Sequence, residues 1–188
     1  MPSTKHKEIM ARKVNAATIA LMHKFENCRL KAYECPKSLA LPKEKKFWTI
    51  GYGNTRYEDG SRVKEGDVIT QERADSLFLT ILSGFEEDVD NLLKVRVSDN
   101  KFGALVSFAY NVGSDIDADT IPEGLGDSTL LKLVNANPND PRIYQYKIGT
   151  DGIAETQSCA FLNWVNKGSN FEKGLRRRRQ AECDLYRS

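Results

Sequence analysis

The stretch between Ser98 and Gly113 constrains the fold more than any other part of the chain. Its apolar residues recur on every side of a helix and leave almost no polar face; they are Phe102, Leu105, Val106, Phe108 and Ala109. Ser98 is suited to cap a helix and Gly113 to end one. Because a helix that is apolar all round must be covered by other elements, we expect this helix to be central and buried.

Apolar spacing and capping residues predict further helices on both sides of the central one. One covers residues 9–27, with Val14, Ala17, Leu21 and Phe25 on a single stripe and Glu26 at its C-terminal end. The others start after Thr70, Ser128 and Asp140, and two more lie around residues 161–165 and 174–186. The acidic residues 114–127 are expected to form a surface loop.

Residues 28–62 have a different pattern, in which short apolar runs are broken by prolines and glycines. This pattern is typical of a small, irregular β-sheet. We therefore predict an α+β fold that is mainly helical, with a small N-terminal β-sheet lobe. We expect residues 1–188 to form one domain, in which residues 28–62 are the small lobe, and helix 9–27 with residues 70–188 form a larger helical lobe around the central helix.

The charge balance gives no sign of a nucleic-acid partner, since the formal net charge is only +2. Residues 167–188 are nevertheless basic and include a run from Arg176 to Arg179. Such a run most often forms a solvated or structural face. We also consider its contact with an anionic envelope surface.

The four cysteines are Cys28, Cys35, Cys159 and Cys183, and none shows a spacing that indicates a metal site. We expect no metal and no cofactor. The first twenty residues include several charged side chains and no apolar run suited to a signal peptide or a membrane span. We therefore expect synthesis in the cytosol, with reduced thiols.

Several short blocks, in the same order along the chain, closely resemble the lysozymes of glycoside hydrolase family 24. They are Glu26, residues 30–33, the Trp-Thr-Ile-Gly-Tyr-Gly-Asn-Thr run at 48–55, and residues 104–113, 128–131, 163–168 and 174–182. The resemblance extends from about residue 14 to residue 187. It implies a lysozyme-like fold and a phage-type lysozyme, or endolysin, that acts on peptidoglycan glycan strands.

The active-site residues of that family follow a sequence pattern: a glutamate, then an aspartate or cysteine after eight intervening residues, then a threonine after five more. Glu26 and Cys35 have the first spacing, but position 41 is a leucine and the threonine of the Trp-Thr-Ile-Gly-Tyr-Gly block is Thr49. We infer an insertion of eight residues within 36–47 and expect it to be an exposed loop. The resemblance thus assigns Glu26, Cys35 and Thr49 as catalytic residues.

Cleavage of a glycosidic bond requires a proton for the leaving oxygen and, with inversion, an activated water on the opposite face of the sugar. Glu26 is the expected proton donor, since burial at the end of an apolar helix would favour its protonated form. Cys35 is expected to orient or deprotonate the water, with nearby lysines favouring its thiolate, and Thr49 to hold the same water. The other interpretation of Cys35 is a small buried hydrophobe.

By the same resemblance Tyr33, Tyr52 and Asn54 are candidate substrate-binding residues, whereas Trp164 is expected in the core rather than as a sugar platform. The predicted reaction is hydrolysis of the β-1,4 bond between N-acetylmuramic acid and N-acetylglucosamine. A lytic transglycosylase and a non-catalytic wall-binding protein are the alternatives. We expect a monomer without an integral membrane segment, held in the host cytoplasm until a holin allows it to reach the wall.

Overall fold

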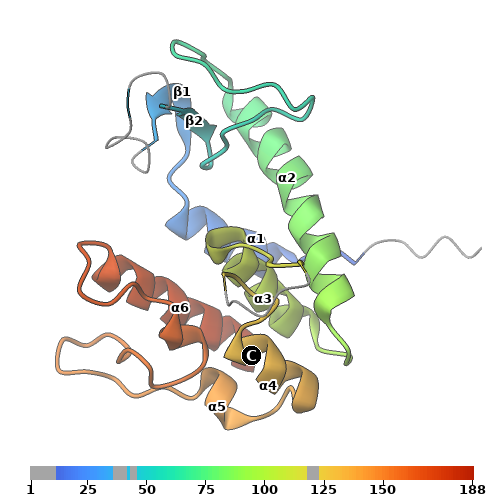
Figure 1. Ribbon diagram of the computed structural model, residues 1–188, viewed down its shortest axis with the longest axis vertical. Coiled ribbons are helices and arrows are strands. Elements are labelled where there is room, and N and C mark those ends of the chain that lie inside the picture. The colour runs from blue at the N-terminus through green and yellow to red at the C-terminus, as the bar shows by residue number, and fades with distance from the viewer. Residues whose placement is uncertain (1–11, 36–41, 43–45, 118–122) are drawn as a thin grey trace, which may run out of the picture.

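The computed structural model describes residues 12–35, 42, 46–117 and 123–188. Its small lobe contains strands β1 (Arg29–Glu34) and β2 (Trp48–Gly51). Helix α2 (Gln71–Leu92) runs from this lobe to the helical lobe, where α1 (Ala16–Phe25), α3 (Asp99–Val112), α4 (Thr129–Ala136), α5 (Pro141–Tyr144), η3 (Phe161–Asn163) and α6 (Glu172–Arg187) lie. Figure 1 shows the two strands at one end of the molecule and α4, α5 and α6 at the other. The α+β prediction is confirmed.

Capping explains where most helices begin. The side chains of Thr70, Ser98, Ser128 and Asp140 each accept a hydrogen bond from a backbone N–H in the first turn of α2, α3, α4 and α5. These starts were all predicted. The start of α1 was not: residues 12–15 are not helical, and the Asn15 side chain caps the helix by accepting from the N–H of Thr18. The prediction of a start near residue 9 is therefore wrong over residues 12–15, and residues 9–11 lie outside the described part.

Helix α3 occupies the centre of the helical lobe, as predicted. Every residue from Phe102 to Ala109 is buried, and the helix packs against α1, α2 and α6. At Gly103, a Cβ atom would lie 1.8 Å from the Oγ1 of Thr18 on α1. The missing side chain thus allows the two helices to approach closely.

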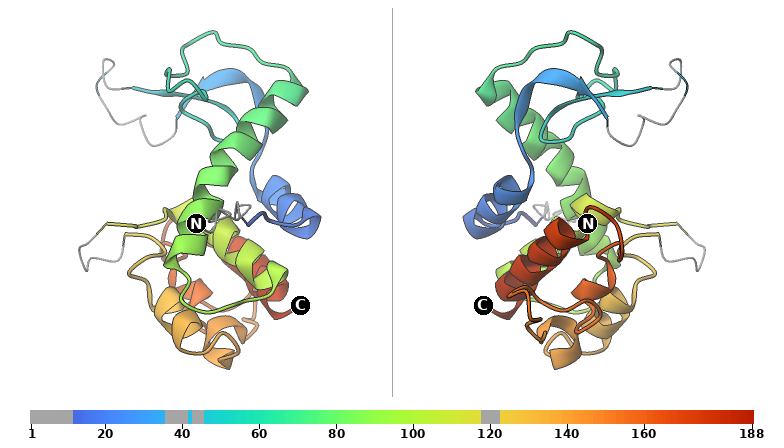
Figure 2. Two further views of the ribbon diagram at one scale, coloured as in Figure 1. Left: turned by 90° about the vertical axis from the view of Figure 1, so that its right-hand side faces the viewer. Right: turned by 90° about the vertical axis from the view of Figure 1, so that its left-hand side faces the viewer.

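Two apolar clusters hold the lobes together, and α2 contributes to both. The smaller cluster comprises Ala32, Ile50, Val63 and Leu77, the last from α2. The larger one surrounds α3 and includes Phe78 and Leu82 of α2. In both side views of Figure 2, α2 spans the distance between the strands and the helical lobe. The long helix therefore fixes one lobe to the other.

The last part of the chain differs from its prediction in one detail. The segment expected as a helix at 161–165 is only the short 3-10 helix η3. Helix α6 follows from Glu172 and has several buried charged residues among its buried positions. Of the two interpretations of the basic run, a solvated face does not hold for Arg178 and Arg179, which are buried and have a structural role.

Candidate active site

A groove with a volume of about 1070 Å³ lies between the hairpin of the small lobe and the helical lobe. The hairpin contributes Tyr33, Cys35, Phe47 and Thr49, and the loop after it contributes Tyr52 and Thr55. Opposite them are Glu26, the end of α3, and Trp164 with residues around the start of α6. The structure therefore brings all three predicted catalytic residues to one groove.

Glu26 lies at the C-terminal end of α1, where its backbone N–H donates to the carbonyl of Met22. Its side chain is 19% exposed, and its carboxylate forms an ion pair with Arg178 of α6. The sequence predicted apolar surroundings for this carboxyl group. The structure instead places a guanidinium beside it.

Arg178 belongs to a buried charge cluster, by which we mean Glu26, Arg178, Arg179 and Glu182. Arg178 donates to Glu182 at 3.2 Å and to the carbonyl of Ser107 at 3.1 Å, and Arg179 lies 2.8 Å from Glu182. The side chain of Arg178 is 5% exposed, and those of Arg179 and Glu182 are fully buried. Two positive and two negative groups balance each other, as buried charges require.

The pKa values of the two arginines show the two opposing effects. Burial lowers the pKa of Arg178, but the carboxylates of Glu182 and Glu26 outweigh it and raise the value overall. Burial lowers the pKa of Arg179 to about 10, although Glu182 opposes the change. Both guanidinium groups are charged at neutral pH. Arg178 is consequently a fixed positive charge next to Glu26.

The hairpin register explains how Cys35 and Thr49 reach the same groove although Thr49 comes fourteen positions after Cys35. Strands β1 and β2 are antiparallel, with Tyr33 opposite Thr49, and the N–H of Cys35 donates to the carbonyl of Phe47 at 2.9 Å. Alternation along a strand puts Tyr33 and Cys35 on one face, together with their partners. The predicted insertion within 36–47 falls between the two paired segments in the sequence. Residues 36–41 and 43–45 lie outside the described part.

Thr49 has a buried hydroxyl group without a hydrogen-bond partner in the described part of the chain. Its side chain is 3% exposed, and in the described part of the chain no group forms a hydrogen bond with its hydroxyl. A buried hydroxyl without a partner costs about 1–3 kcal/mol. Because Thr49 lines the groove, a water or a substrate atom there would satisfy it.

Of the predicted substrate-binding residues, Tyr33 and Tyr52 line the groove and Asn54 is not among its lining residues. Asn54 is buried, and its side-chain oxygen accepts from the N–H of Tyr52 at 3.2 Å. The Tyr52 hydroxyl donates to Asp75 at 2.8 Å, and its ring stacks on His23 at 4.5 Å. Burial and the hydrogen bond to Asp75 raise the pKa of Tyr52 to about 12. Asn54 thus shapes the turn that carries Tyr52.

Several residues of the site were missed or only partly predicted. Trp164 lines the groove and also packs edge-on against Phe108 with ring centroids 5.7 Å apart, so it serves both the core and the groove. Arg178 and Glu182 were within matched sequence blocks but were not assigned to the site. The sequence signal that could have indicated their inward position is their spacing, since both fall on the same helical stripe as Leu175 and Tyr186.

The cysteines and the described helices set limits on other chemistries. None of the four cysteines is in a disulfide, and the sulfurs of Cys159 and Cys183 lie 3.2 Å apart. Within residues 12–35, 42, 46–117 and 123–188, no group of three or more His, Cys, Asp or Glu side chains is arranged to hold a metal ion. None of the helices in these ranges is long and apolar enough to cross a membrane.

Two phage endolysins are similar in sequence to this chain. The endolysin of Bacillus phage B103 is 36% identical over 173 residues, which is 92% of this chain and 53% of that protein. The endolysin of Bacillus phage PZA is 33% identical over 175 residues, which is 93% of this chain and 55% of that protein. The chain therefore spans about half the length of these two relatives.

Solved structures give the same answer for the fold. The muramidase domain of SpmX from Asticaccaulis excentricus superimposes with a TM-score of 0.68 at 27% identity, covering 94% of this chain and 99% of that one. The family model described as phage lysozyme matches residues 23–182, a span that contains Glu26, Cys35, Thr49 and the buried charge cluster. The chain belongs to the phage lysozyme family.

Proposed function

We propose that this chain is an endolysin muramidase that hydrolyses the β-1,4 bond between N-acetylmuramic acid and N-acetylglucosamine in peptidoglycan. The observation that carries the proposal is the arrangement across the groove. The carboxylate of Glu26 lines one wall, and the unpartnered hydroxyl of Thr49 lines the other, beside Cys35. Hydrolysis with inversion needs a proton donor and a water site on opposite faces of the sugar.

Glu26 is the proton donor in this proposal. It reacts from its neutral form, after taking up a proton from solvent; when it gives this proton to the leaving oxygen, its carboxyl group returns to the anion that pairs with the guanidinium of Arg178. Arg178 is already oriented by Ser107 and Glu182, so the charge that develops on Glu26 meets a preorganised partner. Arg178 acts here as a positioning residue rather than by touching the sugar.

Thr49 and Cys35 hold the attacking water. The Thr49 hydroxyl accepts or donates one hydrogen bond to it, and the sulfur of Cys35 orients it or accepts its proton. Cys35 has no disulfide partner; it directly follows β1, bonds to Phe47 through its backbone N–H and lines the groove. This division of roles requires no metal and no cofactor.

The biological setting is inferred from the relatives, which are phage endolysins. We infer that the substrate is the glycan strand of the bacterial wall and that the protein acts as a monomer. It remains in the host cytoplasm until a membrane-permeabilising holin opens the way to the wall. Arg178 and Arg179 are buried, so any contact of the C-terminal helix with the anionic envelope would be made by its outward-facing residues.

Digestion of purified sacculi tests the function. The native protein should release muropeptides with reducing N-acetylmuramic acid ends, as measured by mass spectrometry. Glu26→Gln should lower the rate by about 10²–10⁴-fold, the usual contribution of a general acid. Glu65→Gln, at an exposed position of the small lobe, is the matched control and should retain the native rate.

Other products would refute the proposal in different ways. Only 1,6-anhydromuramic ends would identify a lytic transglycosylase, in which the muramic 6-hydroxyl replaces water. Binding to sacculi without any cleavage would identify a wall-binding protein on a lysozyme scaffold. Equal rates for Glu26→Gln and Glu65→Gln would remove Glu26 from the mechanism.

A further inference from the structure

Tyr110, in the last turn of α3, has a hydroxyl group that reaches the small lobe. The residue lines the groove together with Tyr52, and its hydroxyl donates a hydrogen bond to the backbone carbonyl of Tyr52 at 3.1 Å. Tyr52 belongs to the loop after β2, whereas α3 is the central helix of the helical lobe. This hydrogen bond therefore joins the two walls of the groove.

On the side of the helical lobe, the last turns of α3 are bonded to the buried charge cluster. The carbonyl of Ser107 accepts from Arg178 at 3.1 Å, and the side chain of Asn111 accepts from the second arginine of the cluster at 2.8 Å. Tyr110 lies between these two residues in the sequence, and Arg178 also pairs with Glu26. The backbone position of Tyr110 is thus tied to that of the proposed proton donor.

The ring of Tyr110 is held by aromatic contacts with α2. Its centroid lies 5.6 Å from that of Phe78 and 5.2 Å from that of Phe85. Burial raises the pKa of Tyr110, and the carboxylate of Glu26 raises it further. An ordinary tyrosine has a pKa of ~10, so this hydroxyl keeps the proton that it donates throughout the neutral range.

On the side of the small lobe, the turn from Ile50 to Asn54 is closed by hydrogen bonds. Ile50 and Asn54 pair through two backbone hydrogen bonds of 2.9 Å, and the Asn54 side chain accepts from the N–H of Tyr52 at 3.2 Å. Thr49 directly precedes this turn in β2. Because the turn is bonded internally, a shift of the Tyr52 carbonyl is passed on to Thr49.

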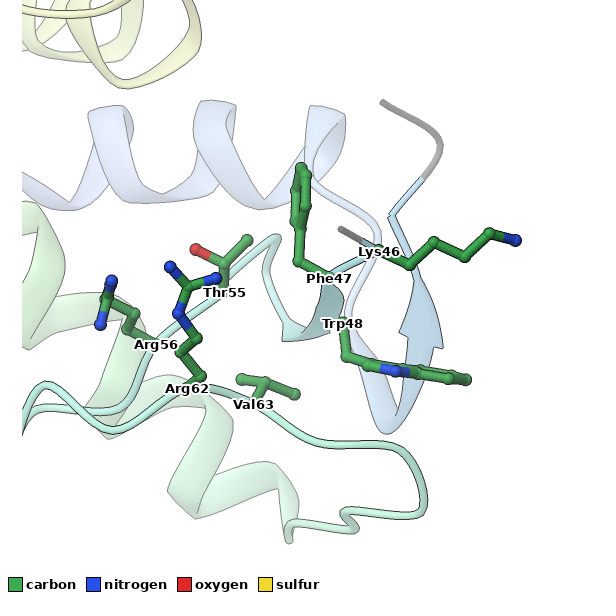
Figure 3. A pocket seen from close by; sticks show the side chains of 7 residues that line it. All are labelled: Lys46, Phe47, Trp48, Thr55, Arg56, Arg62 and Val63. Atoms are coloured by element: carbon green, nitrogen blue, oxygen red, sulfur yellow. The ribbon is translucent and has the colours of Figure 1, made fainter. Parts of the chain in front are cut away.

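Beyond the turn, the chain is bonded to the rest of the small lobe. The N–H of Val63 donates to the carbonyl of Thr55 at 3.1 Å, and Arg56 and Arg62 pair in an isolated antiparallel bridge. Figure 3 shows these four residues around a pocket of about 220 Å³ on the small lobe. The turn therefore moves with the small lobe, and Tyr110 connects it to the helical lobe.

We propose that the hydrogen bond from Tyr110 to the carbonyl of Tyr52 is a latch that sets the distance across the groove between Glu26 and Thr49. Tyr110 is then a positioning residue for the hydrolysis. This inference rests on the proposed function, because hydrolysis with inversion needs the proton donor and the water site at a fixed separation. Without the hydroxyl, fewer molecules hold the water at the position from which it attacks.

The substitution Tyr110→Phe tests the latch because it keeps the ring and removes the hydroxyl. On soluble peptidoglycan oligomers kcat should fall about tenfold, less than the roughly 10²-fold cost of a 1 Å misplacement. KM should stay within about twofold of the native value, since the hydroxyl binds protein rather than sugar. Tyr186→Phe is the matched control and should retain the native kcat. The Tyr186 hydroxyl also donates to a backbone carbonyl, that of Pro138 at 2.9 Å, but Tyr186 is not among the described residues that line the groove.

A double-mutant cycle shows whether the latch acts through Thr49. In protein that carries Thr49→Val the proposed water site is already impaired, so adding Tyr110→Phe should lower kcat by less than about twofold. A fall of the same size in both backgrounds would mean that Tyr110 acts elsewhere, and it would overturn the proposal. An unchanged kcat would do the same, as would a raised KM alone, which would assign the hydroxyl to sugar binding.

Hydrogen exchange of backbone amides separates this proposal from the proposed function, because it needs no cleavage. Tyr110→Phe should speed the exchange of the Tyr52 and Asn54 amides about threefold to tenfold, the range expected for one hydrogen bond, while Tyr186→Phe leaves them unchanged. Native exchange rates in this turn of the Tyr110→Phe protein would refute the latch. A native protein that fails to cleave sacculi would refute the proposed function, and the exchange rates would still decide whether the latch holds the turn.

Discussion

The buried charge cluster gives the sharpest stability prediction, through the substitution Glu182→Gln. Glu182 is fully buried and is the shared partner of Arg178 and Arg179; it also accepts from the hydroxyl of Ser107 at 2.9 Å. Neutralising it leaves two buried guanidinium groups with only Glu26 as a counter-charge. The cluster changes from balanced to an excess of one positive charge.

The expected cost follows from the loss of one partner in a buried ion pair, which is about 3–5 kcal/mol. For a protein of this length each kcal/mol lowers the melting temperature by about 2–4 °C. The melting temperature should therefore fall by about 6–20 °C. Arg178 and Arg179 keep some compensation from Glu26, Ser107 and Asn111, which favours the lower half of that range.

Urea and thermal unfolding, followed by circular dichroism, measure the effect. The matched control is Glu58→Gln, which removes a carboxylate from the more exposed pair with Arg73 and should cost about 0–1 kcal/mol. Replacing Glu182 and Arg179 together by Leu and Met should recover part of the loss, since an apolar pair leaves fewer charges unpaired. A Glu182→Gln protein as stable as the Glu58→Gln protein would refute the reasoning.

Four further predictions concern the groove and the helices. Iodoacetamide should abolish most activity on sacculi and Cys35→Asp should protect it; equal sensitivity of the two proteins would count against Cys35. Thr49→Val should lower kcat by about tenfold to a hundredfold while Thr49→Ser stays within a few-fold, and full activity of the valine variant would remove the hydroxyl from the mechanism. Gly103→Ala should lower the free energy of unfolding by about 1–3 kcal/mol by overpacking against α1. A Cβ at Gly84 would meet nothing within 4 Å, so Gly84→Ala should instead stabilise α2 by about 0.5–1 kcal/mol. Equal urea midpoints for the two variants would contradict this prediction. The pKa of Tyr52 is about 12 in the folded state and ~10 in the unfolded state. Between these pH values Tyr52 therefore carries its proton only in the folded protein. The native protein should lose ~1.4 kcal/mol more stability per pH unit than Tyr52→Phe across that window, and equal slopes in urea titrations would show that Tyr52 does not hold the proton.

The helical lobe could be predicted well because its signals are local. Capping residues such as Ser98 and Ser128 act within one turn, and the apolar surface of α3 requires a central position whatever surrounds it. The start of α1 was misplaced because the apolar stripe continues before Asn15. The helix starts after Asn15 because the Asn15 side chain accepts a hydrogen bond from the N–H of Thr18. The apolar stripe alone does not show which residue forms such a cap.

The groove could be predicted only through the resemblance, and its charges could not be predicted at all. Arg178 shares a helical stripe with Leu175 and Tyr186, but a basic run usually faces water, so this stripe alone does not predict that the two arginines are buried. Their burial depends on Glu182 and on a carboxylate 152 positions earlier in the chain. The pair with Glu26 is long-range and leaves no mark in the spacing of α6, whereas the pairs with Glu182 lie within that helix.

The same charge cluster also fixes how the reaction would be divided between the lobes. Arg178 joins the end of α1 to α3 and α6 through Glu26, Ser107 and Glu182, so the proposed proton donor is held by the core of the helical lobe. Thr49 belongs to the hairpin, whose apolar cluster reaches that core through α2. The proposed proton donor and the proposed water site are therefore built by different clusters. Their separation depends on the packing of α2, since that helix is shared by both.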